Sequence, residues 1–255
     1  MLAMRLVRFE HLIDLNRVAD LQGVRRDDGV IAIGAMTRQV DVGRNAEIAA
    51  SLPLLAEATG HIGHFQIRNR GTIGGSVAHA DPAAEYPAVV LALDAEMEAV
   101  NRTGRRRIPA AEFFQGTWAT ALDADELLVS VRIPVWGERA GFAVEEIASR
   151  AGDFALAGVA CGVQLGSDGT VKRAAIGLIG MASTPIRASA AEAALTGATP
   201  DAADLVEISR LAVADVEPPS DVHASSNYRR KVGAWLVQQA VQRAIERSMN
   251  GGSDV

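Results

Sequence analysis

The chain has 255 residues, of which 49% are hydrophobic and 22% charged, so it can bury a sizeable core in one large or two ordinary domains. The formal net charge of −6, without basic segments interleaved with aromatic residues, disfavours nucleic-acid binding and an anionic membrane surface. The single cysteine, Cys161, excludes a disulfide framework and a cysteine-held iron–sulfur cluster within this chain.

The first part of the chain predicts two strands and a helix. Residues 11–15 and 30–33 are predicted to form short strands from their apolar patterns. Residues 46–60 have small and apolar residues at helical spacing and end at a glycine. One continuous helix is therefore predicted there, despite Pro53.

Residues 67–76 combine two arginines with three glycines in five residues. Glycines let a backbone pass close to a ligand and direct its N–H groups toward it, and arginines suit an anion. The segment therefore predicts a cradle for a phosphate or pyrophosphate, although a tight turn without ligand explains the glycines equally well. No Lys-Ser or Lys-Thr follows and the spacing is not Gly-x-Gly-x-x-Gly, which excludes a Walker-type phosphate loop and a Rossmann fingerprint.

A second helix and three strands follow this segment. Asp81 and Pro82 are typical of an N-cap and a first helical position, and they predict a helix that reaches about Leu93. Alternating polar and apolar residues predict strands at residues 96–101, 106–108 and 126–133.

After Pro134 the pattern indicates a smaller second unit. Strands at residues 142–148, 158–165 and 171–179 could form an antiparallel meander, with a hairpin turn at residues 167–169. Helices are predicted at residues 188–195, 200–214 and 227–249, and the apolar stripe of the last suits covering the meander. The predicted fold class is α+β, with one domain over residues 1–136 and a smaller one over residues 141–250, a three-stranded antiparallel sheet covered by helices.

The sequence Ile-Arg-Asn-Arg-Gly-Thr-Ile-Gly-Gly-Ser at residues 67–76, with Ala-His-Ala-Asp-Pro-Ala-Ala-Glu-Tyr-Pro at residues 78–87, carries a family resemblance. It closely resembles the second FAD-binding segment in the flavoprotein (medium) subunit of molybdenum hydroxylases. The likeness is closest to aerobic carbon monoxide dehydrogenases, with the FAD domain of xanthine dehydrogenases further off. Other matches follow in the family's order at residues 11–15, 33–37, 126–134, 150–155, 184–188 and 228–230.

The resemblance implies an FAD-binding domain of the molybdenum-hydroxylase and vanillyl-alcohol-oxidase type, followed by a domain like the carbon monoxide dehydrogenase flavoprotein C-terminal domain. It implies FAD as the cofactor. Residues that match the family's pyrophosphate and ribityl contacts are Thr72, Ile73, Gly74, Gly75 and Ser76.

Three further positions are implied with an alternative open at each. Asp81 either faces a ribityl hydroxyl or simply caps the helix that starts at Pro82. Glu85 stands where an acidic residue of the family approaches the flavin, but many relatives have the shorter Asp there. Leu128 matches a position that packs near the isoalloxazine ring, and an ordinary core leucine is the alternative. No catalytic residue and no metal ligand is expected in this chain.

One feature of the family has no counterpart in this sequence. Relatives have an earlier glycine loop, Ala-Gly-Gly-x-Ser, that also holds the FAD pyrophosphate, whereas residues 1–6 resemble the stretch just after that loop. An opening strand–helix–strand unit of roughly 30 residues is expected to be missing. A start assigned at an internal methionine explains this, and half a flavin site is the alternative.

The resemblance implies a subunit that passes electrons from a partner's 2Fe–2S clusters through FAD to an external acceptor. The expected partners are a molybdenum-cofactor large subunit and a 2Fe–2S small subunit, as a dimer of heterotrimers in the cytoplasm, with no nucleic acid and no membrane span. The alternatives are an FAD-deficient scaffold subunit of the same complex and a free-standing nucleotide-binding module. Carbon monoxide, a purine, an N-heterocycle and an aldehyde all stay open as substrates, because the substrate is chosen on another polypeptide.

Overall fold

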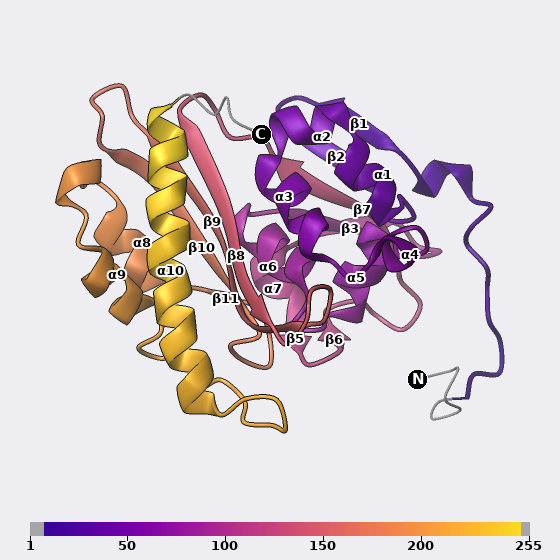
Figure 1. Cartoon of the computed structure of the whole chain (residues 1–255). Coiled ribbons are helices and arrows are strands. Elements are labelled where there is room, and N and C mark those ends of the chain that lie inside the picture. The colour runs from indigo at the N-terminus through magenta and orange to yellow at the C-terminus, as the bar shows by residue number, and fades with distance from the viewer. Residues whose placement is uncertain (1–7, 251–255) are drawn as a thin grey trace.

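The computed structural model describes residues 8–250 and has an α+β fold built on two antiparallel sheets (Figure 1). Residues 1–6, discussed above for their resemblance, lie outside the described range. The helices of the first unit lie to one side of the second sheet, and the long C-terminal helix lies on its other side (Figure 1).

The first sheet has five strands in the order β1-β2-β7-β3-β4, and every neighbouring pair is antiparallel. Its strands are β1 (Val24–Asp27), β2 (Val30–Gly34), β3 (Glu96–Val100), β4 (Arg105–Pro109) and β7 (Leu127–Pro134). Ile31, Ile33, Met97, Val131 and Ile133 are fully buried and form part of one core with the helices. The predicted alternation is seen in β3, which has one buried face, whereas β2 and β7 also bury residues on their other face.

Helices of the first unit pack against this core and against the second sheet. They are η1 (Ala19–Leu21), α1 (Gln39–Arg44), α2 (Ala46–Ser51), α3 (Pro53–His61), α4 (Phe65–Arg68), α5 (Ile73–His79), α6 (Glu85–Ala92) and α7 (Ala110–Phe113). A small hairpin of β5 (Phe114–Gly116) and β6 (Ala119–Thr120) follows α7.

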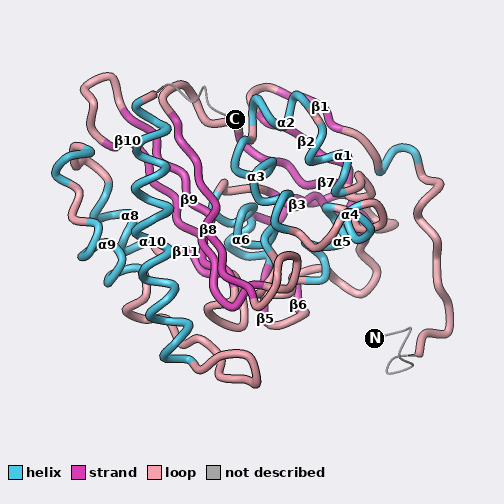
Figure 2. The backbone as a smooth tube through the Cα atoms, viewed as in Figure 1, coloured by secondary structure: helices cyan, strands magenta, loops and turns pink. Residues whose placement is uncertain are grey.

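The second sheet contains the predicted meander of β8 (Ala140–Ala148), β9 (Ala155–Leu165) and β10 (Val171–Ile179). It has four strands, not the three predicted, because β11 (Ile186–Arg187) pairs with β10 at its edge (Figure 2). Two residues are too short to give an alternation signal. The helices of this unit are α8 (Ser189–Leu195), η2 (Pro200–Ala202), α9 (Leu205–Ala212) and α10 (Ser226–Met249).

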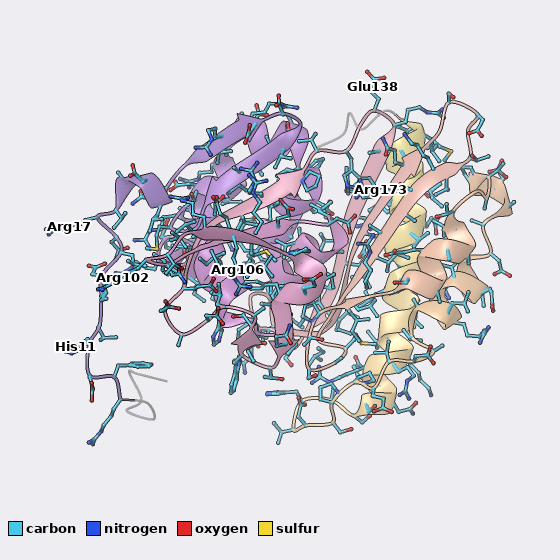
Figure 3. The ribbon with its side chains drawn as sticks, turned by 180° about the vertical axis from the view of Figure 1, so that it is seen from behind. His11, Arg17, Arg102, Arg106, Glu138 and Arg173 are labelled. Carbon is cyan, nitrogen blue, oxygen red and sulfur yellow. The ribbon has the colours of Figure 1, made fainter. Side chains whose placement is uncertain are left out.

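The two units share a packed and ion-paired boundary. Phe142 and Ala175 of the second sheet belong to the same core as the first sheet. Arg173 pairs with Asp94 at 2.5 Å and lies 4.1 Å from the ring centre of Trp136, and Figure 3 shows it on the second sheet, facing the first unit. These contacts fix the relative position of the two units. The predicted boundary between residues 136 and 141 stays a prediction.

Four local predictions were wrong. The helix predicted over residues 200–214 is the short η2 followed by α9, because Asp204 begins a new helix as its N-cap residue. Residues 11–15 are not a strand: they lie in an extended arm that runs clear of the body, where Figure 3 places His11 and Arg17. The predicted helix over residues 46–60 is two helices, because Pro53 begins α3 and cannot continue α2. The helix predicted from Pro82 begins at Glu85.

None of the helices within residues 8–250 is both long and apolar enough to cross a membrane.

Candidate functional site

Helix α5 begins in the glycine-rich segment. Thr72 is its N-cap residue, and the Thr72 hydroxyl oxygen accepts a hydrogen bond of 3.0 Å from the N–H of Gly75. A threonine N-cap satisfies one of the N–H groups that the first turn of a helix leaves open. The segment, expected to be either a phosphate cradle or a tight turn, is therefore the start of a helix, whose C-cap residue Ala80 is in the left-handed conformation (φ 53°).

The first two N–H groups of α5, which precede that of Gly75, are hydrogen-bonded to the segment that follows β2. The Ile73 N–H donates to the Thr37 carbonyl oxygen at 3.1 Å, and the Gly74 N–H donates to the Ala35 carbonyl oxygen at 2.9 Å. These bonds fasten the helix to the end of the first sheet. They also mean that an anion at this end would have to share these N–H groups.

Gly74 and Gly75 have different structural reasons to be glycine. A Cβ on buried Gly74 would lie 2.4 Å from the Cβ of Ala35, so this glycine permits close packing of α5 on the chain after β2. Gly75 is exposed, and a Cβ there would meet only the Thr72 hydroxyl oxygen, at 2.8 Å. Gly75 therefore leaves a bare surface at this turn, where a side chain would crowd the hydroxyl oxygen of the buried Thr72. The partly exposed Ser76 adds a second hydroxyl in the same turn.

Asp81 forms a turn after α5 and does not cap α6. One carboxylate oxygen accepts a hydrogen bond of 2.9 Å from the Ala83 N–H, and the other accepts one of 3.2 Å from the indole N–H of Trp118. The N-cap position of α6 is Ala84, three residues later than predicted. The carboxylate has unused lone pairs, so an additional hydroxyl donor can still bind it.

Trp118 is the residue near this site that the sequence did not reveal. Its backbone is left-handed (φ 58°), its N–H donates to the Ala80 carbonyl oxygen at 3.2 Å, and its ring stacks against His79 with 6.1 Å between ring centres. The neighbouring Thr117 hydroxyl donates to the Ser183 carbonyl oxygen at 3.2 Å. The β5–β6 hairpin thus connects the end of α5 to the second unit. In the sequence, only an aromatic residue in a polar turn marks it.

Glu85 is the first residue of α6 and is only 4% exposed. Burial raises the pKa of its carboxyl to about 7, with a further contribution from the charge of Asp81. Burial and the charge of Glu85 likewise raise the pKa of Glu146, at the end of β8, to about 8. A carboxyl in this state can gain or lose a proton near neutral pH.

Leu128 is 5% exposed and belongs to the main core. Val131 faces Met97 across the β3–β7 pair and Leu128 faces Ala99, so three residue steps on β7 match two on β3. This bulge turns Leu128 and Val131 to the same buried face. The bulge residue Val129 accepts a hydrogen bond of 2.9 Å from the Ala35 N–H, which links it to the chain beneath Gly74.

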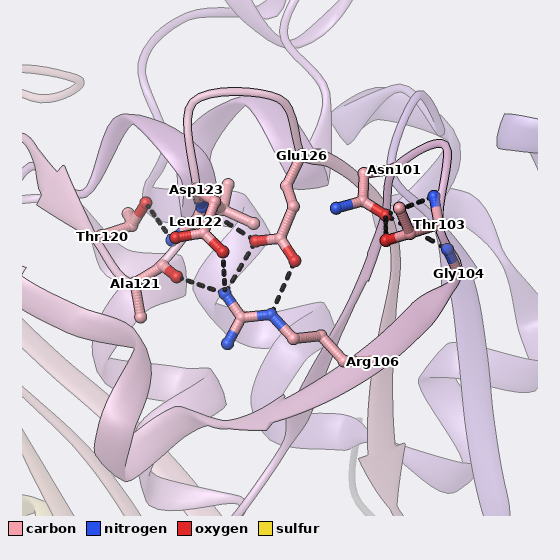
Figure 4. A network of polar contacts seen from close by, with 9 residues as sticks. All are labelled: Asn101, Thr103, Gly104, Arg106, Thr120, Ala121, Leu122, Asp123 and Glu126. Atoms are coloured by element: carbon pink, nitrogen blue, oxygen red, sulfur yellow. Dashed lines mark hydrogen bonds and ion pairs between the residues drawn. The ribbon is translucent and has the colours of Figure 1, made fainter.

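The loop that leads into β7 is held by an ion pair from β4 (Figure 4). The Arg106 guanidinium donates to both carboxylate oxygens of Glu126, at 2.6 and 2.7 Å, and to the Ala121 carbonyl oxygen at 2.7 Å. This guanidinium and the Asp123 N–H lower the pKa of Glu126 to about 2. The network fixes the loop between the β5–β6 hairpin and Leu128.

A cleft of about 1280 Å³ lies where the two units meet. Of the predicted site residues only Asp81 borders it, together with Trp118 and, from the second unit, Phe154. A second cleft of about 910 Å³ lies between the α3–α4 region and the end of β8, bordered by Arg68 and Glu146. The glycine segment lies at one end of α5, and the first cleft lies at the other.

Comparison with family models shows which protein family has this two-domain arrangement. A family model described as the FAD binding domain in molybdopterin dehydrogenase matches residues 1–136. A second, described as the CO dehydrogenase flavoprotein C-terminal domain, matches residues 142–244. The chain belongs to the FAD-binding subunits of molybdenum hydroxylases. The resemblance seen in the sequence is thereby confirmed, and FAD is the cofactor of the family.

Individual relatives and solved structures match nearly the whole chain. The chain is 40% identical over 248 residues to the alpha subunit of the 6-hydroxypseudooxynicotine dehydrogenase complex of Paenarthrobacter nicotinovorans, covering 97% of this chain and 84% of that one. A solved carbon monoxide dehydrogenase of Hydrogenophaga pseudoflava matches with a TM-score of 0.91 and 39% identity, over 96% of this chain and 85% of that chain. Quinoline 2-oxidoreductase of Pseudomonas putida 86 matches with a TM-score of 0.91 and 32% identity, over 97% of this chain and 86% of that chain.

Proposed function

We propose that this subunit holds FAD beside the N-terminal end of α5 and passes electrons from a partner's 2Fe–2S clusters to an external acceptor. The observation that carries the proposal is the exposed, side-chain-free surface at Gly75, where a Cβ would lie 2.8 Å from the hydroxyl oxygen of the buried Thr72. FAD, when bound, supplies the centre that accepts and releases the electrons.

The chain's own residues have distinct tasks in this proposal. The hydroxyls of Thr72 and Ser76 would donate to the pyrophosphate, and Ile73 and Gly74 would fix the helix on which these hydroxyls stand. Asp81 would accept from a ribityl hydroxyl with the lone pairs that Ala83 and Trp118 leave unused.

Glu85 and Leu128 are proposed to support the FAD site from the buried side of the elements that carry it. Glu85 is buried at the start of α6, where its shifted pKa lets it hold or release a proton near neutral pH. Leu128 is core-facing, and the bulge in β7 couples its position to Ala35 and so to Gly74. Neither residue borders the cleft between the two units.

The proposed partners are a molybdenum-cofactor large subunit and a 2Fe–2S small subunit in a dimer of heterotrimers. This is supported by relatives whose names describe them as medium chains or as subunits of dehydrogenase complexes. The two domains proposed are residues 1–136 and 141–250. A cytoplasmic location stays a prediction.

The test is FAD retention followed by a redox cycle. The purified chain, mixed with excess FAD and desalted, should keep close to one FAD per chain, measured by absorbance. The bound flavin should be bleached by dithionite without air and recover its colour on addition of ferricyanide. A chain that folds but retains no FAD would contradict cofactor binding by these residues alone. The same assay on a chain extended upstream to include an Ala-Gly-Gly-x-Ser loop would then separate the two remaining explanations, because retention there indicates a truncated start and continued loss indicates the scaffold role.

A further inference from the structure

The outward side of helix α10 carries large apolar and aromatic side chains. Tyr228, Trp235 and Met249 are 45%, 51% and 52% exposed, respectively. The residues that α10 buries against the second sheet lie on its opposite side. A helix packed on a core by one face usually presents charged and polar residues on the other, so this outer face is unusual. Figure 1 shows no other element in front of α10, which leaves the face open to another molecule.

The exposed residues of this face follow one line along the helix. Tyr228, Trp235, the exposed Gln242 and Met249 succeed one another every seven residues, over nearly the whole length of α10. Seven residues are close to two helical turns, so the four side chains lie on the same side. A seven-residue repeat is the spacing at which one helix packs along another. These four residues, which we call the outer stripe, therefore suit a second helix laid along α10.

One positive and one negative charge lie beside the outer stripe. Lys231 comes three residues after its first member, and Glu246 comes three residues before its last, so both are on the same exposed side of the helix. Among residues 8–250 neither of them forms an ion pair, whereas Arg247 of the same helix pairs with Glu57 at 2.6 Å. The two charges are thus available to another molecule.

The outer face of α10 is symmetric about its middle. The midpoint between Tyr228 and Met249 and the midpoint between Lys231 and Glu246 both lie between residues 238 and 239. An antiparallel copy of α10, related by a twofold axis at this point, places the lysine of each copy beside the glutamate of the other. It also places the aromatic ring at position 228 beside the thioether at position 249, which is a favourable contact.

Trp235 and Gln242 follow the same symmetry. Their midpoint also lies between residues 238 and 239, so the amide side chain of one copy covers the indole ring of the other. Removal of both rings from water is the main favourable contribution, because exposed ion pairs contribute little affinity and mainly set orientation. A parallel copy would instead place Lys231 beside Lys231 and Glu246 beside Glu246. The charges therefore select the antiparallel arrangement.

We propose that α10 is the surface through which this chain associates with a second copy of itself, by antiparallel packing of the two outer stripes about a twofold axis between residues 238 and 239. The inference goes beyond the proposed function and does not require FAD. A helix of another sequence could cover the apolar residues, but the match of Lys231 with Glu246 is a match of this helix with itself.

Charge reversal tests the orientation of the two copies. Sedimentation velocity of the purified chain, over a concentration series, should show a reversible monomer–dimer equilibrium. Lys231→Glu and Glu246→Lys should each raise the dissociation constant of the dimer at least tenfold, and the double variant should return within threefold of the wild type. Lys172→Glu, at the exposed and only other lysine of the chain, is the matched control and should have no effect. A wild type that stays monomeric, or a dimer that the reversals leave unchanged, would overturn the inference.

Disulfide crosslinking tests the position of the axis. Gln239 lies next to the proposed axis, so the cysteines of two Gln239→Cys copies come within disulfide reach when the helix axes are about 8–10 Å apart. In Asn227→Cys the two cysteines would be roughly 35 Å apart along the helices. The natural Cys161 is fully buried and does not compete. Mild oxidation should crosslink Gln239→Cys and not Asn227→Cys, and equal crosslinking of both, or none of the first, would contradict the proposed axis.

Two further measurements separate association from folding and from cofactor binding. Trp235→Ala, which changes no charge, should also weaken the dimer at least tenfold, and circular dichroism should show that every variant is folded. FAD retention is measured on the same samples. A dimer without FAD supports the inference even where the proposed function fails, and a monomer that retains FAD overturns the inference alone.

Discussion

The two ends of helix α5 show two ways of building a site. At its N-terminal end, neighbouring residues Thr72, Gly74 and Gly75 organise the surface through bonds within a few residues and through contact with Ala35. At its C-terminal end, Asp81 is bonded to Trp118, which is 37 residues away in sequence. The first end combines a local cap with bonds to Ala35 and Thr37, and it carries a family motif. The second combines a local turn at Ala83 with the distant contact to Trp118, and no motif marks that contact.

This difference explains why the two ends have different chemistry. The N-terminal end offers hydroxyls beside a glycine surface, which suits a phosphate-bearing cofactor. The C-terminal end offers the fixed carboxylate of Asp81 beside the ring of Trp118, which suits a hydroxyl donor next to a planar group. One short helix thus carries a proposed contact to the same cofactor at each of its ends.

The largest effect is expected at the packing glycine of the first end. Gly74→Ala places a Cβ 2.4 Å from the Ala35 Cβ, so the variant should lose about 3 kcal/mol of unfolding free energy. Gly75→Ala should change stability by less than about 1 kcal/mol, because its Cβ meets only a side-chain oxygen and alanine favours helix. Urea unfolding of both variants measures the difference. Equal losses would show that the two glycines do not differ as described.

The next largest effect is expected at Glu85, the buried carboxyl a few residues beyond the C-terminal end of α5. The folded pKa of Glu85 is about 7, above its unfolded value of 4.5, so its ionisation costs stability as the pH rises from about 4.5 to about 7. Glu85→Gln should therefore be more stable than the wild type above pH 7, by about 3 kcal/mol, with no difference below pH 4.5. Thermal unfolding across this pH range gives the result. A difference that does not change with pH would contradict the raised pKa.

The sequence predicted what depends on local pattern and missed what depends on distant contacts. Strands β3, β7 and β8–β10 were predictable from their local runs of apolar residues, even where, as in β9, both faces of the strand are buried. The helical state of α5 was not predicted, because Gly74 and Gly75 are poor helix formers. The Thr72 cap and the packing on Ala35 offset this low helix propensity. Trp118 was not predictable, because its partners Asp81 and His79 are brought to it by the fold.

A smaller effect is expected at the cap of α5. Thr72→Val removes the oxygen that accepts the Gly75 N–H, so it should cost about 1 kcal/mol of stability, whereas Thr72→Ser should be close to neutral. Under the proposed function, Thr72→Val should also weaken FAD binding and Thr72→Ser should not. Chemical unfolding and flavin absorbance can be measured on the same samples. Valine and serine variants with equal stability would argue against the cap.

The smallest effect is expected at the ion pair that fixes the loop beyond the β5–β6 hairpin. The pKa of Glu126 is lowered from 4.5 to about 2 by Arg106, so its contribution to stability is present above pH 4.5 and is lost as the pH falls toward 2. Because the pair is near the surface, Glu126→Gln should lower the unfolding midpoint only slightly at pH 7 and not at all near pH 2. A destabilisation that persists at pH 2 would point to a packing role for Glu126.

The central claim is that FAD lies against the bare turn at Gly75, and its most direct test is the FAD dissociation constant of three proteins. Isothermal titration would compare the wild type, Gly75→Ala and Gly104→Ala, since a Cβ on Gly104 meets nothing within 4 Å. We expect the wild type and Gly104→Ala to bind FAD equally, and Gly75→Ala to bind at least tenfold more weakly at unchanged stability. Equal affinity in all three proteins would place the cofactor elsewhere and contradict the account.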